Sequence, residues 1–170
     1  MLRITCYVLR VTVYVLRLSY IVIYNGVMHL SIYTDGGSRG NPGEAAVGVV
    51  IKNEKEDVLK KYGQVIGETT NNEAEYQALI FALKKIKQVF GKAKMAEAQL
   101  EVRMDSELIV NQLNHRYKIE EPNLQQLFLQ VWNLMLDFGP IKFTAIPREQ
   151  NKEADRLVNQ ALDAKQEKLL

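Results

Sequence analysis

The feature that most constrains the fold is a change in hydrophobic rhythm partway along the chain. From Met28, apolar residues follow strand-like patterns in three successive segments, and further on they recur at the spacing of amphipathic helices. The three predicted strands cover residues 29–34, 45–52 and 58–67. Short turns between them indicate that these strands pair antiparallel, as a β-meander.

After the third strand, helices and strands alternate. We predict helices over residues 71–90, 106–114, 122–138 and 151–168, and strands over 100–104 and 141–146. Because the later parallel strands need crossover connections, this order predicts one α/β domain over residues 28–170. Its mixed five-stranded sheet has three antiparallel strands followed by parallel ones, with helices flanking the sheet.

The charge balance does not by itself predict a nucleic-acid partner. The 170 residues carry 22 Lys and Arg against 20 Asp and Glu. Arg3, Arg10 and Arg17 lie in the first 27 residues, so 19 basic residues meet 20 acidic ones in the remainder. Binding to a nucleic acid must therefore come from local patches and shape. A single cysteine, Cys6, excludes an intrachain disulfide and fits a reducing cytoplasm.

Residues 1–27 form a hydrophobic N-terminal extension, in which two similar seven-residue segments begin at Tyr7 and at Tyr14. Arg10 and Arg17 argue against a membrane-spanning helix, because an arginine in mid-span costs roughly 2.5–3.5 kcal/mol. Small residues that would form a signal-peptide cleavage site do not follow the apolar run. We expect upstream sequence read through from a start codon placed too early, with Met28 as the true start; a membrane-surface anchor is an alternative.

Four acidic residues stand where the predicted elements would aim them toward one end of the sheet. Asp35 and Asp105 each follow a strand, Glu75 lies in the first turns of a helix, and Asp155 begins the last helix. Ligands of open α/β sheets gather at the carboxyl ends of parallel strands. Crowded carboxylates repel one another, so they are tolerated chiefly as ligands of hard cations. Taken singly, each is more often a solvated surface group or a helix cap.

The residues around these acids carry a family resemblance. Four blocks contain them in order: Asp35-Gly-Gly-Ser-Arg-Gly-Asn-Pro-Gly43, Thr70-Asn-Asn-Glu-Ala-Glu-Tyr76, Met104-Asp-Ser106 and Arg148-Glu-Gln-Asn-Lys-Glu-Ala-Asp155. In order and spacing they resemble the signature blocks of the type 1 ribonuclease H family, from Met28 to about Ala164. A lone Asp-Gly-Gly would be a weak signal, whereas four ordered blocks are a strong one.

The resemblance implies a ribonuclease H-like fold and an endonuclease that cuts the RNA strand of RNA/DNA hybrids, leaving 5′-phosphate ends. It assigns Asp35, Glu75, Asp105 and Asp155 as catalytic residues and as ligands of two Mg²⁺ ions, with Mn²⁺ as a substitute. Glu75 is chosen over Glu73 because the acid of the family follows the Asn-Asn pair by three residues. Paired metal ions activate water and hold the scissile phosphate.

The resemblance also implies contacts with the nucleic acid. These candidates are Gly36, Gly37, Ser38, Asn41, Thr70, Asn71, Asn72, Ser106 and Arg148. Glycines let the backbone approach 2′-hydroxyl groups closely. Each group also has a plainer explanation: the glycine segment suits a hairpin turn, and Thr70, Asn71 and Asn72 suit helix capping.

Two departures from the family pattern affect the expected turnover rate and the expected affinity for nucleic acid. The histidine found shortly before the last acid in the best-known bacterial members is absent, and Arg148 is nearest to its role, or acts as a phosphate clamp. The basic, Trp-bearing handle is reduced to residues 115–121. We expect slower turnover and weaker, more salt-sensitive binding, as in a compact bacterial and archaeal branch.

A different class of function is a non-catalytic module of the same fold that binds hybrid or duplex RNA. Retention of all four acids favours the enzyme, because a decayed member would be expected to lose one. A third hypothesis, that the chain is a fragment of a reverse transcriptase polyprotein, is the one that we favour least. We expect a cytoplasmic monomer without stable membrane association.

Overall fold

The computed structural model describes residues 27–167 and confirms the predicted α/β architecture. One mixed sheet has the strand order β3-β2-β1-β4-β5. Its strands are β1 (His29–Gly40), β2 (Gly43–Asn53), β3 (Val58–Thr69), β4 (Gln99–Met104) and β5 (Ile141–Ala145). β2 runs antiparallel to β1 and to β3, whereas β4 runs parallel to β1 and to β5. Apart from Val27, the predicted N-terminal extension lies outside the described residues.

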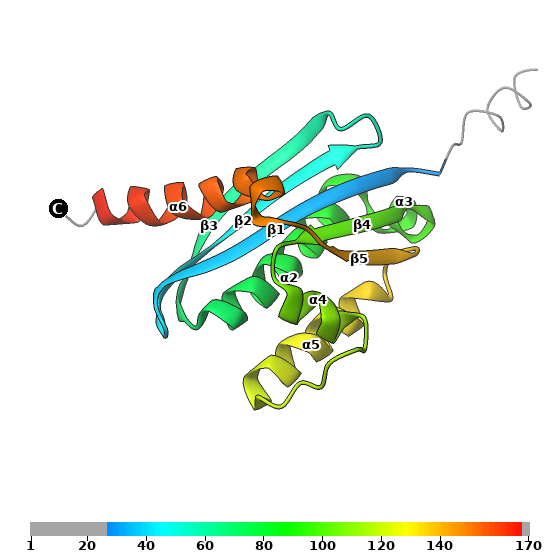
Figure 1. Ribbon diagram of the computed structural model, residues 1–170. Coiled ribbons are helices and arrows are strands. Elements are labelled where there is room, and N and C mark those ends of the chain that lie inside the picture. The colour runs from blue at the N-terminus through cyan, green and yellow to red at the C-terminus, as the bar shows by residue number, and fades with distance from the viewer. Residues whose placement is uncertain (1–26, 168–170) are drawn as a thin grey trace, which may run out of the picture.

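Helices cover both faces of this sheet (Figure 1). They are α2 (Asn71–Phe90), α3 (Lys92–Glu97), α4 (Glu107–Leu113), α5 (Pro122–Met135) and α6 (Lys152–Glu167), with a 3₁₀ turn η1 (Arg148–Gln150) before α6. α2 packs on β1 and β2 and carries α5 on its outer side, while α6 crosses β1, β2 and β3 on the opposite face. Over residues 27–167, the helices are too short or too polar to cross a membrane.

Two hydrophobic cores hold these layers together. The larger core lies between the sheet and α2, where Ile32, Val49 and Leu83 are fully buried. A smaller core lies under α6, where Val158 and Leu162 pack against Ala46. These apolar contacts fix α6 to the sheet.

The observed elements differ most from the predicted ones in two places, the length of β1 and the presence of α3. β1 was expected to end at Thr34 but continues to Gly40, so that Gly36 and Gly37 pair with Val47 and Ala46 of β2. The glycine segment is therefore a strand, and the turn is confined to residues 41–42. α3 was not predicted, because six residues show too little periodicity to be recognised in a sequence.

Glycines allow the helices to approach the sheet at backbone distance. A Cβ atom built on Gly36 would lie 2.2 Å from the carbonyl carbon and oxygen of Ala74 in α2. A Cβ atom on Gly48 would lie 2.1 Å from the carbonyl oxygen of Ala154 in α6. Real Cβ atoms cannot approach so closely, so both glycines are needed for packing.

The Asp-Gly-Gly block offers a matched pair of substitutions. Gly36→Ala forces α2 away from β1, and we expect it to lower the free energy of unfolding by about 3 kcal/mol, the upper end for overpacking. Gly37→Ala meets only Cγ1 of Val158, at 3.2 Å, and a side chain can adjust, so the loss should stay below about 1 kcal/mol. Urea denaturation of both variants measures the difference, and equal losses would contradict this packing role.

Candidate metal centre at the ends of β1 and β4

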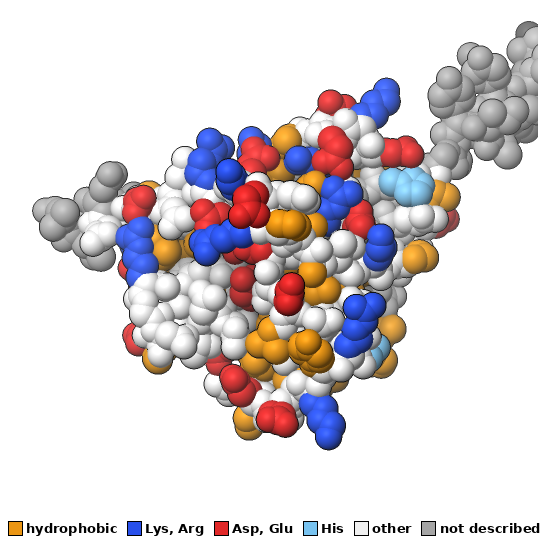
Figure 2. Space-filling view, in the orientation of Figure 1, with side chains coloured by type: hydrophobic (Ala, Val, Ile, Leu, Met, Phe, Trp, Pro, Cys, Tyr) orange, Lys and Arg blue, Asp and Glu red, His pale blue; other side chains and the backbone are white. Residues whose placement is uncertain are grey.

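A cleft of about 250 Å³ opens where β1 and β4 separate. The parallel pairing of these strands ends at Tyr33 and Arg103. Asp35 then lies on the free part of β1, Asp105 follows β4, and Glu75 reaches the same cleft from the first turns of α2. Acidic and basic side chains gather together around the start of α6 on this face (Figure 2).

Three carboxylates meet inside this cleft. One oxygen atom from each of Asp35, Glu75 and Asp105 lies within 4.8 Å of the other two. Asp35 is 8% exposed and Glu75 is 6% exposed, while Asp105 is half-buried. Asp155 lines the cleft but lies outside this tight group. The fold thus brings all four predicted acids to one cleft, with three of them in one cluster.

Burial and repulsion oppose the ionisation of these acids. Loss of hydration is the largest of the effects that together raise the pKa of Asp35 to about 7. Repulsion from Asp105 and Asp155 adds to it, and the nearby Arg148 offsets only part of the rise. Burial raises the pKa of Glu75 as well, with repulsion from Asp35 and Asp105 adding to the effect. Without a counter-charge, the cluster favours protonated acids.

A divalent cation fits this arrangement. Oε2 of Glu75 is buried and has no hydrogen-bond partner among the described residues. Buried polar atoms are normally satisfied, so such an atom beside two further carboxylates marks a place for a ligand. Carboxylate oxygens are the ligands that hard cations prefer, and a cation removes the repulsion among them. Asp35, Glu75 and Asp105 can therefore hold a divalent metal.

Asp155 is held at the rim of the cleft by two neighbours. Arg148 donates to Oδ1 of Asp155 at 2.9 Å, and Asn159 donates to Oδ2 at 3.2 Å. The side chain of Arg148 is 77% exposed, and its ion pair with Asp155 raises its pKa. Arg148 thus stands at the entrance as an accessible positive charge, beside an acid that it partly neutralises.

Asn151 was not singled out from the sequence as a site residue. It is 1% exposed, and its Nδ2 atom donates to the carbonyl oxygen of Thr34 at 2.9 Å and to Oδ1 of Asp105 at 2.7 Å. Its position just before α6 resembles an ordinary helix cap, so only its partners reveal the link to the cluster.

The predicted nucleic-acid contacts fall into two groups. Asn71 joins the β1–β2 turn to α2: its side chain accepts a bond from the backbone of Ser38 at 3.3 Å, and its backbone donates to Asn41 at 3.0 Å. Gly36, Gly37, Ser38, Asn71 and Arg148 line the cleft. Asn41, Thr70, Asn72 and Ser106 do not line it.

Thr70 has the capping role that the sequence also allowed, and Ser106 caps α4, a role that was not predicted for it. The Thr70 hydroxyl accepts from the backbone of Glu73 at 3.3 Å, and the Ser106 hydroxyl accepts from that of Ile109 at 3.5 Å. Glu73 completes the capping box at the start of α2 and accepts a bond from Asn123. Glu73 is therefore engaged away from the cluster, and only Glu75 reaches it.

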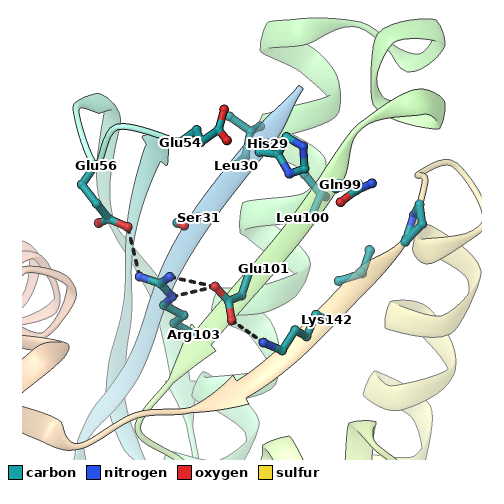
Figure 3. A pocket seen from close by; sticks show the side chains of 12 residues that line it. His29, Leu30, Ser31, Glu54, Glu56, Gln99, Leu100, Glu101, Arg103 and Lys142 are labelled. Atoms are coloured by element: carbon teal, nitrogen blue, oxygen red, sulfur yellow. Dashed lines mark hydrogen bonds and ion pairs between the residues drawn. The ribbon is translucent and has the colours of Figure 1, made fainter. Parts of the chain in front are cut away.

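A larger cavity, of about 410 Å³, lies elsewhere on the sheet, over β1, β4 and β5 (Figure 3). Four of its charged groups are paired: Arg103 donates to Glu101 and Glu56, and Lys142 donates to Glu101 at 3.0 Å. Burial disfavours ionised Glu101, but these bonds outweigh it and lower its pKa to about 2. These four side chains form ion pairs with one another, whereas the clustered acids of the smaller cleft have no such mutual pairing.

Comparison with solved structures decides the family. The LC11 ribonuclease H1, isolated from compost by a metagenomic approach, is 49% identical, with a TM-score of 0.76, and the match covers 81% of this chain and 97% of that one. The chain belongs to the type 1 ribonuclease H family. A second structure of LC11 ribonuclease H1 contains an RNA/DNA hybrid. The sequence model of the family described as "Reverse transcriptase-like" also matches, over residues 33–161.

Other members of the family come from an archaeon and a bacterium. Ribonuclease HI of Halobacterium salinarum is 39% identical over 131 residues, which is 77% of this chain and 63% of that protein. Its crystal structure matches with a TM-score of 0.73. The bifunctional protein Rv2228c of Mycobacterium tuberculosis is 41% identical over 138 residues, or 81% of this chain. This chain spans only 36% of the length of that mycobacterial relative.

The raised pKa of Asp35 predicts how the metal-free fold responds to pH. In the folded protein, Asp35 keeps its proton up to about pH 7, whereas in the unfolded chain it loses the proton near pH 3.8. The free energy of unfolding in EDTA should therefore fall as pH rises between these values. The shift corresponds to about 4 kcal/mol at most. Asp35→Asn should flatten the fall. Urea denaturation at pH 4, 5.5 and 7 measures it, and stability that rises with pH in both proteins would contradict the prediction.

Proposed function

We propose that this chain is an endonuclease that hydrolyses the RNA strand of RNA/DNA hybrids and leaves 5′-phosphate ends. The observation that carries the proposal is the group of Asp35, Glu75 and Asp105 in an open cleft, with oxygen atoms within 4.8 Å of one another. The raised pKa values of Asp35 and Glu75 and the unpartnered Glu75 oxygen support a role as cation ligands rather than as structural groups.

The four acids have distinct parts in this proposal. Asp35, Glu75 and Asp105 hold Mg²⁺, or Mn²⁺ as a substitute, and Asp155 completes a two-ion site from the rim. When bound, such ions supply charge stabilisation for the phosphate and lower the pKa of water. Burial of Asp35 and Glu75 keeps bulk water from these two carboxylates, and the anchored Asp155 faces the arriving strand from α6.

Recognition of the RNA strand is assigned to the edge of the cleft. Gly37 and Ser38 offer main-chain groups and a hydroxyl beside the acids, within reach of ribose 2′-hydroxyl groups. Asn71 stiffens this edge through its bonds to Ser38 and Asn41. Thr70, Asn72 and Ser106, which do not line the cleft, are assigned to the flanking backbone of the nucleic acid. The hybrid-bound LC11 relative supports this class of substrate.

The cleavage assay uses a labelled RNA/DNA hybrid with Mg²⁺ or Mn²⁺. We expect wild type to cut only the RNA strand, and EDTA to stop the reaction. Asp35→Asn and Asp105→Asn should each lower kcat by at least about a hundredfold, the scale of losing a group that stabilises transition-state charge. Gel analysis of 5′- and 3′-labelled strands measures rate and end chemistry.

The control for the assay is Asp57→Asn, in an exposed turn far along the sheet from the cleft. It should cut as wild type does. Hybrid binding without metal-dependent cleavage by wild type would favour the alternative, a non-catalytic module that binds hybrid or RNA. Cleavage that survives Asp35→Asn would sink the assignment of the acids.

Arg148 is assigned as a phosphate contact because its guanidinium is accessible at the cleft entrance. Arg148→Ala should raise KM and reduce the slope of log KM against log salt concentration by about one, the value for one lost phosphate contact. Lys142→Ala is the matched control, because that exposed cation lies on the sheet outside the cleft. Equal salt slopes for wild type and Arg148→Ala would contradict the assignment.

We retain three further expectations as predictions: a monomer, a cytoplasmic location and no stable membrane association. The reduced handle at residues 115–121 also supports modest affinity, and the missing histidine supports slow turnover.

A further inference from the structure

The amide of Asn151 links three chain segments that carry acids. Its Nδ2 atom donates to the carbonyl of Thr34, which directly precedes Asp35, and to the carboxylate of Asp105. Its own backbone carbonyl accepts bonds from Ala154 at 3.0 Å and Asp155 at 3.1 Å. One residue therefore contacts β1 next to Asp35, the residue after β4 and the first turn of α6.

The chemistry of the partners fixes the orientation of this amide. Both the Thr34 carbonyl and the Asp105 carboxylate can only accept hydrogen bonds, so the NH₂ group must face them and use both of its hydrogen atoms. Its Oδ1 atom is left buried, without a partner among the described residues. An unsatisfied buried oxygen costs free energy, which the two donated bonds offset.

The bond to Asp105 also selects a geometry for the cluster. Oδ1 of Asp105 is held at 2.7 Å by a neutral donor, so the carboxylate cannot rotate freely. A neutral donor orients the acid without cancelling the negative charge that attracts a cation. By contrast, the arginine beside Asp155 partly neutralises the acid it holds.

We propose that Asn151 is a positioning residue, which sets the spacing among Asp35, Asp105 and Asp155 by tying β1 and Asp105 to the start of α6. This inference rests on the proposed function, since it concerns the same cation-binding acids. Asn151 touches neither substrate nor reacting atoms in this role. It acts through the carboxylate of Asp105 and through the register of α6 on the sheet.

The test compares wild type with Asn151→Ala and Asn151→Ser in the full chain. Mn²⁺ affinity is measured by titration calorimetry, kcat and KM on a labelled hybrid, and the melting temperature in EDTA. For Asn151→Ala we expect Mn²⁺ affinity and kcat to fall ten- to a hundredfold, the usual range for a partner of a metal ligand, with KM within about threefold. Asn151→Ser should fall less, because its hydroxyl keeps one donor.

Asn114→Ala is the matched control, because the half-buried Asn114 amide also donates to a backbone carbonyl, that of Phe143 at 3.1 Å, away from the cleft. It should lower the melting temperature without changing Mn²⁺ affinity or kcat. If Asn114→Ala loses as much kcat as Asn151→Ala, or if Asn151→Ala matches wild type within twofold in both quantities, the proposal is overturned.

Two further outcomes are also decisive. If Asn151→Ala does not fold, Asn151→Ser is measured in its place, and unchanged Mn²⁺ affinity and kcat in that variant overturn the proposal. If wild type binds Mn²⁺ but cuts no hybrid, the proposed function fails alone, since the Mn²⁺ affinities of the variants still report the role of Asn151.

Discussion

The backbone contact between β1 and α2 at Gly36 is the constraint on which the site depends. With only a hydrogen atom on Gly36, the Ala74 carbonyl of α2 lies against the strand. Asp35 and Glu75 are the next residues along these two segments, so their carboxylates are brought together by the same contact. A side chain at Gly36 would push α2 away from β1 and would thereby separate Asp35 from Glu75. Packing and chemistry therefore share one requirement at this position.

The acids themselves work against the stability of this arrangement. Burial and mutual repulsion raise the pKa values of Asp35 and Glu75, so without a cation the cluster either holds protons or weakens the fold. The buried apolar side chains under α2, and the smaller core under α6, stabilise the fold and offset this cost in free energy. Sites that store unfavourable charge in this way are typical of functional positions in proteins.

The sequence was sufficient for the order of the strands and the longer helices, and for the gathering of the four acids at one cleft, because hydrophobic periodicity and four spaced blocks are local signals. It did not indicate that β1 continues to Gly40, since two adjacent glycines suggest a turn unless the close approach of α2 is known. The role of Asn151 was missed for a similar reason: its partners, Thr34 and Asp105, lie 117 and 46 residues away in the chain. Contacts of this range arise only when the sheet is assembled.

The unequal pairing of β1 has a consequence for how the cleft tolerates change. β2 accompanies β1 as far as Gly40, but β4 leaves it after Tyr33, so along the cleft one edge of β1 bonds to side chains instead of to a strand, as the Thr34 carbonyl does to Asn151 and the Ser38 N–H does to Asn71. The polar groups of a strand edge belong to the peptide backbone, and they persist whatever side chains the edge carries. Substitutions at Ser38 or Arg39 can therefore alter the surface chemistry of the cleft while leaving this row of donors and acceptors in place. The pairing register between β1 and β2 sets the direction of these backbone groups. A shift of that register would therefore displace them far more than a side-chain substitution would.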